Sequence, residues 1–218
     1  MTKKRPVNLP ASIHQRLLNL SVSRSEDPNL TLTRFALERL LYRLGTARIP
    51  VQVDIGFGDT VIPEATEIDY PTLLELPAPR IRAYLPETVV AEKLQAMVAL
   101  GMQNSRMRDF YDLWTIARNF SFEGATLVTA VRATFDRRLT AIPQALPTAL
   151  SDEFATDEHK KNQWKGFLAR SQLENTDVEL TQVIDQLRPF LMPVLEAAAN
   201  ANDFAYIWGS GGPWLTGR

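Results

Sequence analysis

Residues 86–119 read PETVVAEKLQAMVALGMQNSRMRDFYDLWTIARN, and this stretch decides the fold. Pro86 stands in the first turn of a helix, the position that proline prefers, and Gly101 stops the run of Val, Ala, Leu and Met that follows. A second helical run extends from Met107 to Asn119. We therefore predict two consecutive helices, over residues 86–100 and 107–119, at the centre of a mostly helical chain.

Helical patterns continue on both sides of this stretch. One helix is predicted from Pro10 to the break at residues 27–29, and others cover about residues 30–44, 124–138, 158–169 and 178–199. Residues 49–57 instead alternate apolar and polar side chains, which predicts a strand with one buried face. Prolines restrict residues 58–85 to short elements, of which 81–85 is a candidate strand, and residues 208–214 are expected to form a loop.

The composition excludes several kinds of functional site. The 218 residues include no cysteine and two histidines, so disulfides, thiolate metal sites, cysteine nucleophiles and histidine clusters are excluded or disfavoured. His14 and His159 lie on polar helical stretches and are expected at the surface. No apolar run approaches the roughly 20 residues of a membrane-spanning helix, and no apolar segment follows the basic start. We expect a cytoplasmic protein that does not enter the membrane.

Charge is distributed unevenly along the chain. Residues 1–48 carry nine basic and three acidic side chains, whereas residues 49–79 carry six acidic side chains and no basic ones. The basic start favours contact with phosphate groups or an acidic partner. The alternative is that it forms the solvated faces of helices and is neutralised by the acidic segment.

Two residues stand out as candidates for chemistry. Asp54 interrupts an apolar strand pattern near Gly56 and Gly58, as a carboxylate facing a ligand cleft would, or as the polar side of an amphipathic strand would. Lys93 is the only lysine between Lys4 and Lys160, and it lies in an apolar helix. Its ammonium could pair with a phosphate or a carboxylate, or it could be an ordinary exposed position.

Asp109 and Asp112 form a third feature. Their three-residue spacing puts both carboxylates on one part of a helix, close enough to Arg106 and Arg108 to share an ion-pair network. Such a pair can hold Mg²⁺ or position a lysine, although capping and salt bridges are its more common roles. The sequence contains none of the usual phosphate-loop, dinucleotide, serine-hydrolase or zinc-protease motifs, and no Asp-x-Asp.

Four blocks together resemble one protein family. They are residues 11–44, residues 49–59 (IPVQVDIGFGD), the run from Glu87 to Lys93 with residues 108–114 (RDFYDLW), and residues 211–214 (GGPW). In these blocks the chain is similar to the AbiEii/AbiGii toxin family, whose members are nucleotidyltransferase-fold toxins of abortive-infection toxin–antitoxin systems.

The resemblance implies a role for each candidate residue. It makes Asp54 a catalytic and metal-binding carboxylate, Lys93 the contact to the nucleotide phosphates, and Asp109 and Asp112 supporting residues of the Arg-Asp-x-x-Asp-Leu box. The implied chemistry is transfer of NMP from an NTP to an acceptor such as tRNA or another RNA, with Mg²⁺ bridging the triphosphate. The implied protein partner is a cognate antitoxin.

The chain departs from the family pattern at one place. Family members carry a Gly-Ser or Gly-Ala turn and an Asp-x-Asp strand before the strand predicted here, whereas residues 44–48 (LGTAR) join the two elements directly. We therefore predict an α+β, mostly helical fold, with a truncated nucleotidyltransferase-like part over residues 1–85 and a helical domain over 86–218. Transfer is expected to be impaired, and the alternative is an inactive protein- or RNA-binding module.

Overall fold

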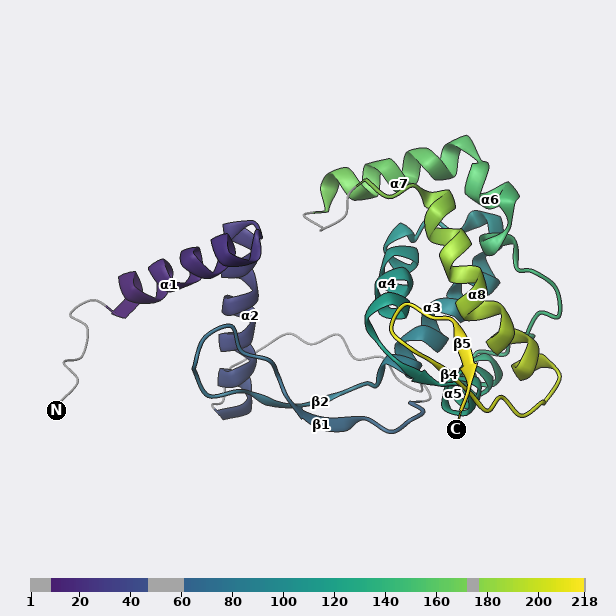
Figure 1. The fold of residues 1–218 in the computed structure, drawn as a ribbon, viewed down its shortest axis with the longest axis horizontal. Coiled ribbons are helices and arrows are strands. Elements are labelled where there is room, and N and C mark those ends of the chain that lie inside the picture. The colour runs from purple at the N-terminus through teal and green to yellow at the C-terminus, as the bar shows by residue number, and fades with distance from the viewer. Residues whose placement is uncertain (1–8, 47–60, 172–176, 218) are drawn as a thin grey trace. The chain divides into compact units, whose positions relative to one another are not determined.

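The computed structural model describes residues 9–46, 61–171 and 177–217 (Figure 1). The chain folds into two compact units. Unit 1 comprises Met1–Asp54 and Glu67–Ala83, and unit 2 comprises Ile55–Thr66 and Tyr84–Arg218. The predicted α+β, mostly helical fold is confirmed, because helices dominate and the strands form two small sheets. The predicted strand over residues 49–57, and Asp54 within it, lie outside the described residues. No helix in the described ranges is long and apolar enough to cross a membrane.

The described part of unit 1 contains two helices and a two-stranded sheet. Helix α1 is Leu9–Arg24 and α2 is Pro28–Thr46, and strands β1 (Thr66–Asp69) and β2 (Arg80–Ala83) pair with each other. The buried carboxylate of Glu38 fixes α2 to the loop between the strands, because its Oε2 accepts a hydrogen bond of 2.8 Å from the backbone N–H of Leu73. Arg39 donates to Pro77 O at 2.8 Å, from the next position of the helix.

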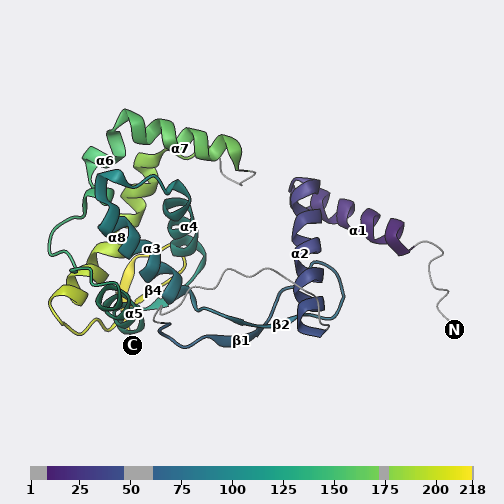
Figure 2. The same ribbon diagram turned by 180° about the vertical axis from the view of Figure 1, so that it is seen from behind.

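Unit 2 is a bundle of helices. The predictions over residues 86–119 are confirmed to the residue, since α3 is Pro86–Leu100 and α4 is Met107–Asn119. The other helices of the bundle are α5 (Gly124–Arg137), α6 (Asp152–Thr156), α7 (Glu158–Arg170) and α8 (Leu180–Ala199), and short 3₁₀ turns cover Gly101–Gln103 (η1) and Thr148–Leu150 (η2). Figure 2 shows the same bundle from behind.

The core of unit 2 lies where α3 and α8 pack on α5. Fully buried apolar side chains from all three helices meet there, among them Leu94, Met97, Leu127, Val131, Leu187 and Leu191. Helix α8 contains Pro189 and Pro193, each of which removes a backbone donor from the helix. Ten buried residues on α8 offset that cost, because burying one aliphatic side chain contributes about 1.5–3 kcal/mol.

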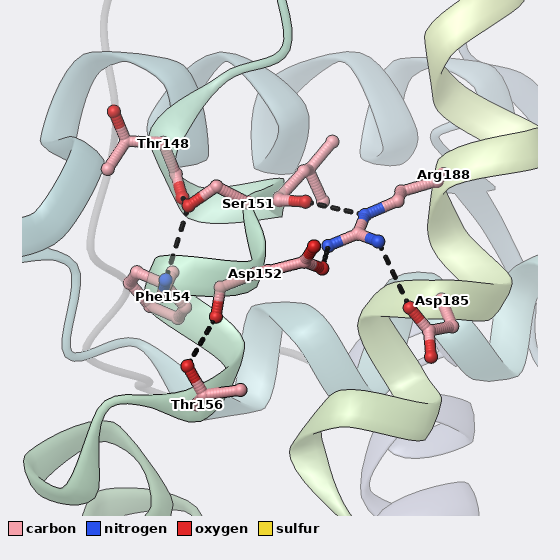
Figure 3. A network of polar contacts seen from close by, with 8 residues as sticks. Thr148, Ser151, Asp152, Phe154, Thr156, Asp185 and Arg188 are labelled. Carbon is pink, nitrogen blue, oxygen red and sulfur yellow. Dashed lines mark hydrogen bonds and ion pairs between the residues drawn. The ribbon is translucent and has the colours of Figure 1, made fainter.

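An arginine joins α8 to the segment that contains η2 and α6 (Figure 3). Arg188 donates from Nε to the buried carbonyl of Leu150 at 2.7 Å and pairs with the carboxylates of Asp152 and Asp185. On the same segment, Ser151 caps α6 by accepting a hydrogen bond of 3.2 Å from the N–H of Phe154. The guanidinium therefore supplies a donor to a carbonyl that water does not reach.

Three short strands form a second sheet in unit 2, in the order β3 (Phe122–Glu123), β4 (Tyr206–Trp208) and β5 (Trp214–Thr216). The prediction of loop over residues 208–214 is wrong at both ends, because Trp208 and Trp214 face each other across antiparallel strands. Each indole N–H also reaches a helix carbonyl: Trp208 donates to Ala117 O at 2.7 Å and Trp214 to Phe190 O at 3.0 Å.

Candidate functional site

Lys93 and the two aspartates of the Arg-Asp-x-x-Asp-Leu box meet in one cluster on α3 and α4. The Lys93 Nζ lies 2.7 Å from Asp109 Oδ1 and 2.9 Å from Asp112 Oδ2. The three side chains are only 20%, 15% and 28% exposed. Lys93 is therefore not the ordinary exposed position that the sequence left open. The aspartates form ion pairs, but their close partner is Lys93 rather than the arginines that the sequence suggested.

The sequence builds this cluster through helical periodicity. On α4, the buried side of the helix carries Phe110, Leu113 and Trp114, so Asp109 and Asp112 fall at its edge, one turn apart. On α3, Val90, Leu94 and Met97 occupy the core, and Lys93 lies beside them. Because α3 contacts α4, the lysine of one helix reaches both carboxylates of the other.

The surroundings of Lys93 keep it charged. Burial on its own lowers the pKa of the ammonium, but the hydrogen bonds to Asp109 and Asp112 and the negative charges of both carboxylates outweigh it, and the net result is a pKa above the usual 10.5. Lys93 is therefore an ammonium ion at neutral pH, and it is a cation rather than a proton acceptor in any reaction near it.

Positive and negative charges balance within the cluster. Arg108, at 68% exposure, extends the network, with its Nε 3.7 Å from Asp112 Oδ2. Two carboxylates, one ammonium and one guanidinium sum to zero formal charge. The sequence also placed Arg106 in this network, but no ion pair joins Arg106 to another residue that the structure describes.

The described residues do not fit a magnesium ion. No group of three or more Asp, Glu or His side chains in the described ranges is arranged to hold a metal. Asp109 and Asp112 each give an oxygen to Lys93, and Mg²⁺ requires several oxygen ligands in near-octahedral geometry. Asp54, the metal ligand that the resemblance implies, lies outside the described residues and is not placed against the cluster.

A cleft lined by a second group of polar residues lies beside this cluster, and no sequence pattern predicted it. Arg106 and Arg108 at the start of α4 line a cleft together with Gln163, Phe167 and Arg170 of α7. More than fifty positions separate the two parts of the chain, so no local spacing indicates that they meet. The pair of arginines at residues 106 and 108 was visible in the sequence, but each has an aspartate one turn later, so the pattern indicated ion pairs rather than a cleft.

Comparison with known proteins identifies the family. The model of the family described as nucleotidyl transferase AbiEii toxin, type IV toxin–antitoxin system, matches residues 12–199. No curated protein and no solved structure matches the chain. The matched range contains both helices of the Lys93 cluster and most of the described part of each unit. The chain therefore belongs to the AbiEii nucleotidyl transferase toxin family of type IV toxin–antitoxin systems.

Proposed function

We propose that this chain is an AbiEii-type toxin in which nucleotidyl transfer is impaired. Family membership gives the general role of a toxin and implies an antitoxin that counteracts it. The reaction that we infer for its lineage moves NMP from an NTP to tRNA or another RNA, in the cytoplasm, as part of a defence against phage. The proposal concerns how much of that reaction this chain retains.

The observation that carries the proposal is the neutral charge of the Lys93 cluster. A nucleoside triphosphate carries several negative charges, and transfer at phosphorus depends on positive groups that face it. Lys93 already gives two of its three N–H donors to carboxylates, at 2.7 and 2.9 Å, so a phosphate that bound to the third would lie close to two negative charges. The sequence also lacks the Asp-x-Asp pair that would hold metal ions for the reaction.

A labelling assay tests the proposal. The purified chain is incubated with Mg²⁺, each of the four NTPs labelled on the α-phosphate, and total tRNA. We expect no incorporation above that of the Lys93→Ala and Asp54→Ala variants. Strong incorporation by the natural chain that both variants abolish would overturn the proposal and make the chain an active transferase.

A thermal melt separates loss of transfer from loss of nucleotide binding. A ligand that binds only the folded state raises the melting temperature by mass action. We expect no rise that depends on Lys93: any change in midpoint caused by an NTP with Mg²⁺ should be the same in the natural chain and in Lys93→Ala. A rise in the natural chain that is absent in Lys93→Ala would show that Lys93 still binds a triphosphate.

A second candidate function is an inactive module that binds RNA. The specific observation in its favour is the arginine-lined cleft between α4 and α7, which contains no carboxylate among its lining residues. This function requires neither metal ions nor the missing Asp-x-Asp pair.

A further inference from the structure

We propose that the cleft between the start of α4 and α7 binds the phosphate of a nucleotide, with its base against Phe167. The inference gives the second candidate function a defined site and rests on it. The cleft has a volume of about 350 Å³ and is lined by Ser105, Arg106, Met107, Arg108, Gln163, Phe167 and Arg170. Ligand sites in proteins begin at about 300 Å³, so a single nucleotide unit has room there.

Positive charge is the main feature of the cleft. Three of its lining residues are arginines, all exposed, and none is acidic. Within the described ranges, Arg106 and Arg170 form no ion pair, and Arg108 has only the 3.7 Å contact with Asp112. Guanidinium groups bind phosphate with two parallel hydrogen bonds, so the two unpaired arginines, Arg106 and Arg170, favour a phosphate ligand.

The N-terminus of α4 adds to the positive charge of the cleft. Arg106 is the N-cap of the 13-residue helix α4, and its own side chain does not cap the helix. The N–H groups of Met107 and Asp109 donate to backbone carbonyls at 2.9 Å. The N-terminus of a helix carries a partial positive charge and attracts anions. The helix end therefore adds a partial positive charge, rather than free N–H donors, to the guanidinium groups of the cleft.

Buried groups next to the lining residues are also short of acceptors. Asn104 is fully buried, and although its Oδ1 accepts from the N–H of Arg106 at 2.8 Å, its Nδ2 has no partner. Lys160, 4% exposed, donates to Asn104 O at 2.9 Å and lies 3.4 Å from the Oε1 of Gln163, a residue of the cleft wall. Among the described residues no carboxylate pairs with Lys160, and its Nζ also lies 5.1 Å from the centroid of the Phe154 ring.

Phe167 distinguishes a nucleotide from a simple anion. Its ring is partly buried and held by Tyr111 and Trp164, with ring centroids 6.0 and 5.5 Å apart. An aromatic side chain that is fixed by its neighbours and lines a cationic cleft is the arrangement on which bases stack in single-strand binding proteins. A nucleotide has a phosphate that can bind the arginines and a base that can stack on Phe167, so it fits both parts of the cleft.

Fluorescence anisotropy with a labelled single-stranded RNA of about 12 nucleotides tests the site in the full chain. We expect the double variant Arg106→Ala/Arg170→Ala to bind about tenfold or more weakly, and its dependence of log K on log salt to fall by about 1. The matched control, Arg16→Ala/Arg24→Ala, removes the same charge from the exposed side of α1 and should bind as the natural chain does. Phe167→Leu should weaken binding without changing the salt dependence.

The outcomes separate this proposal from the proposed function. Equal binding by the natural chain and the Arg106/Arg170 variant, or a larger loss in the Arg16/Arg24 control, would overturn the site whatever the labelling assay shows. Competition by AMP assigns the cleft to free nucleotides, and competition by RNA alone assigns it to a polymer; both support the site. Because Arg106 and Arg170 are exposed, the variants should fold, and Arg170→Gln is the fallback if the double variant does not.

Discussion

At the scale of single residues, Lys93 determines what its cluster can do. An ammonium that lies between two carboxylates of a neighbouring helix stabilises the contact between α3 and α4. The same contacts reduce its availability for phosphate. The structural and the catalytic uses of this lysine therefore compete, and the first is the one that the geometry favours.

We predict that Lys93→Met destabilises the chain by about 2 kcal/mol, because two partly buried carboxylates lose their partner. The figure is below that for a fully buried pair, since all three side chains keep some contact with water. Urea unfolding followed by circular dichroism measures it. The control is Lys161→Met, whose ion pair is with Glu158 at 82% exposure and should be worth less than about 0.5 kcal/mol. Equal losses in the two variants would contradict this account.

The raised pKa of Lys93 gives a separate prediction for alkaline pH. A pKa that is higher in the folded state contributes stability below the unfolded value of 10.5, and this contribution disappears as the pH rises through the folded pKa. The difference in free energy of unfolding between the natural chain and Lys93→Met should therefore be constant up to about pH 9.5 and shrink above 10.5. Urea titrations across this range measure it, and a constant difference to the highest pH would show that Lys93 gains no proton affinity on folding.

At the scale of elements, the turn between β4 and β5 contains two glycines with positive φ, Gly211 and Gly212, and a side chain would clash with a neighbour only at Gly212. Gly212 has a φ of +75°, and a Cβ there would lie 2.4 Å from the indole of Trp208. We predict that Gly212→Ala costs about 1–3 kcal/mol, because both the backbone and the packed indole oppose it. Gly209 in the same turn is the matched control, since a Cβ there meets nothing within 4 Å. Thermal melts of Gly212→Ala and Gly209→Ala measure the difference, and similar melting temperatures for the two variants would contradict the prediction.

The elements also show what sequence patterns can and cannot predict. Proline at the first turn and a terminal glycine locate α3 to the residue, because these signals act within one turn of the chain. The β4–β5 pair escapes prediction because three-residue strands are too short for a periodic pattern, and their stability comes from Trp208 and Trp214 bonding to distant helix carbonyls.

The candidate site likewise contains residues that local spacing predicts and residues that only the packing of helices brings together. Asp109 and Asp112 were recognisable as a pair from their helical spacing, but which cation they bind depends on how α3 packs against α4. Arg170 and Phe167 gave no signal, because they join the cleft only through the packing of α7. The assigned roles of Asp54 and Lys93 in catalysis, and the boundary between residues 85 and 86, stay predictions.

At the scale of the whole molecule, the two units differ in how much apolar surface they bury. In the described part of unit 1, the large apolar side chains that are buried are Leu17 and Leu74. Unit 2 buries a continuous cluster that includes residues of every helix from α3 to α8. Because local opening is easiest where few apolar contacts are lost, the two units should have different stabilities.

We predict that the backbone amides of α1 and α2 exchange with deuterium about 100-fold faster than those in the centres of α3, α5 and α8. This ratio corresponds to about 2.7 kcal/mol less free energy of opening. Most of the stability of a helix in a protein comes from packing of one face, and α1, of 16 residues, and α2, of 19 residues, have few buried neighbours. Hydrogen exchange with mass spectrometry, corrected for intrinsic rates, gives the ratio for each segment. Equal protection in the two units would contradict this prediction. Faster exchange in unit 1 that slows when RNA is added would instead place part of the RNA-binding free energy in this unit.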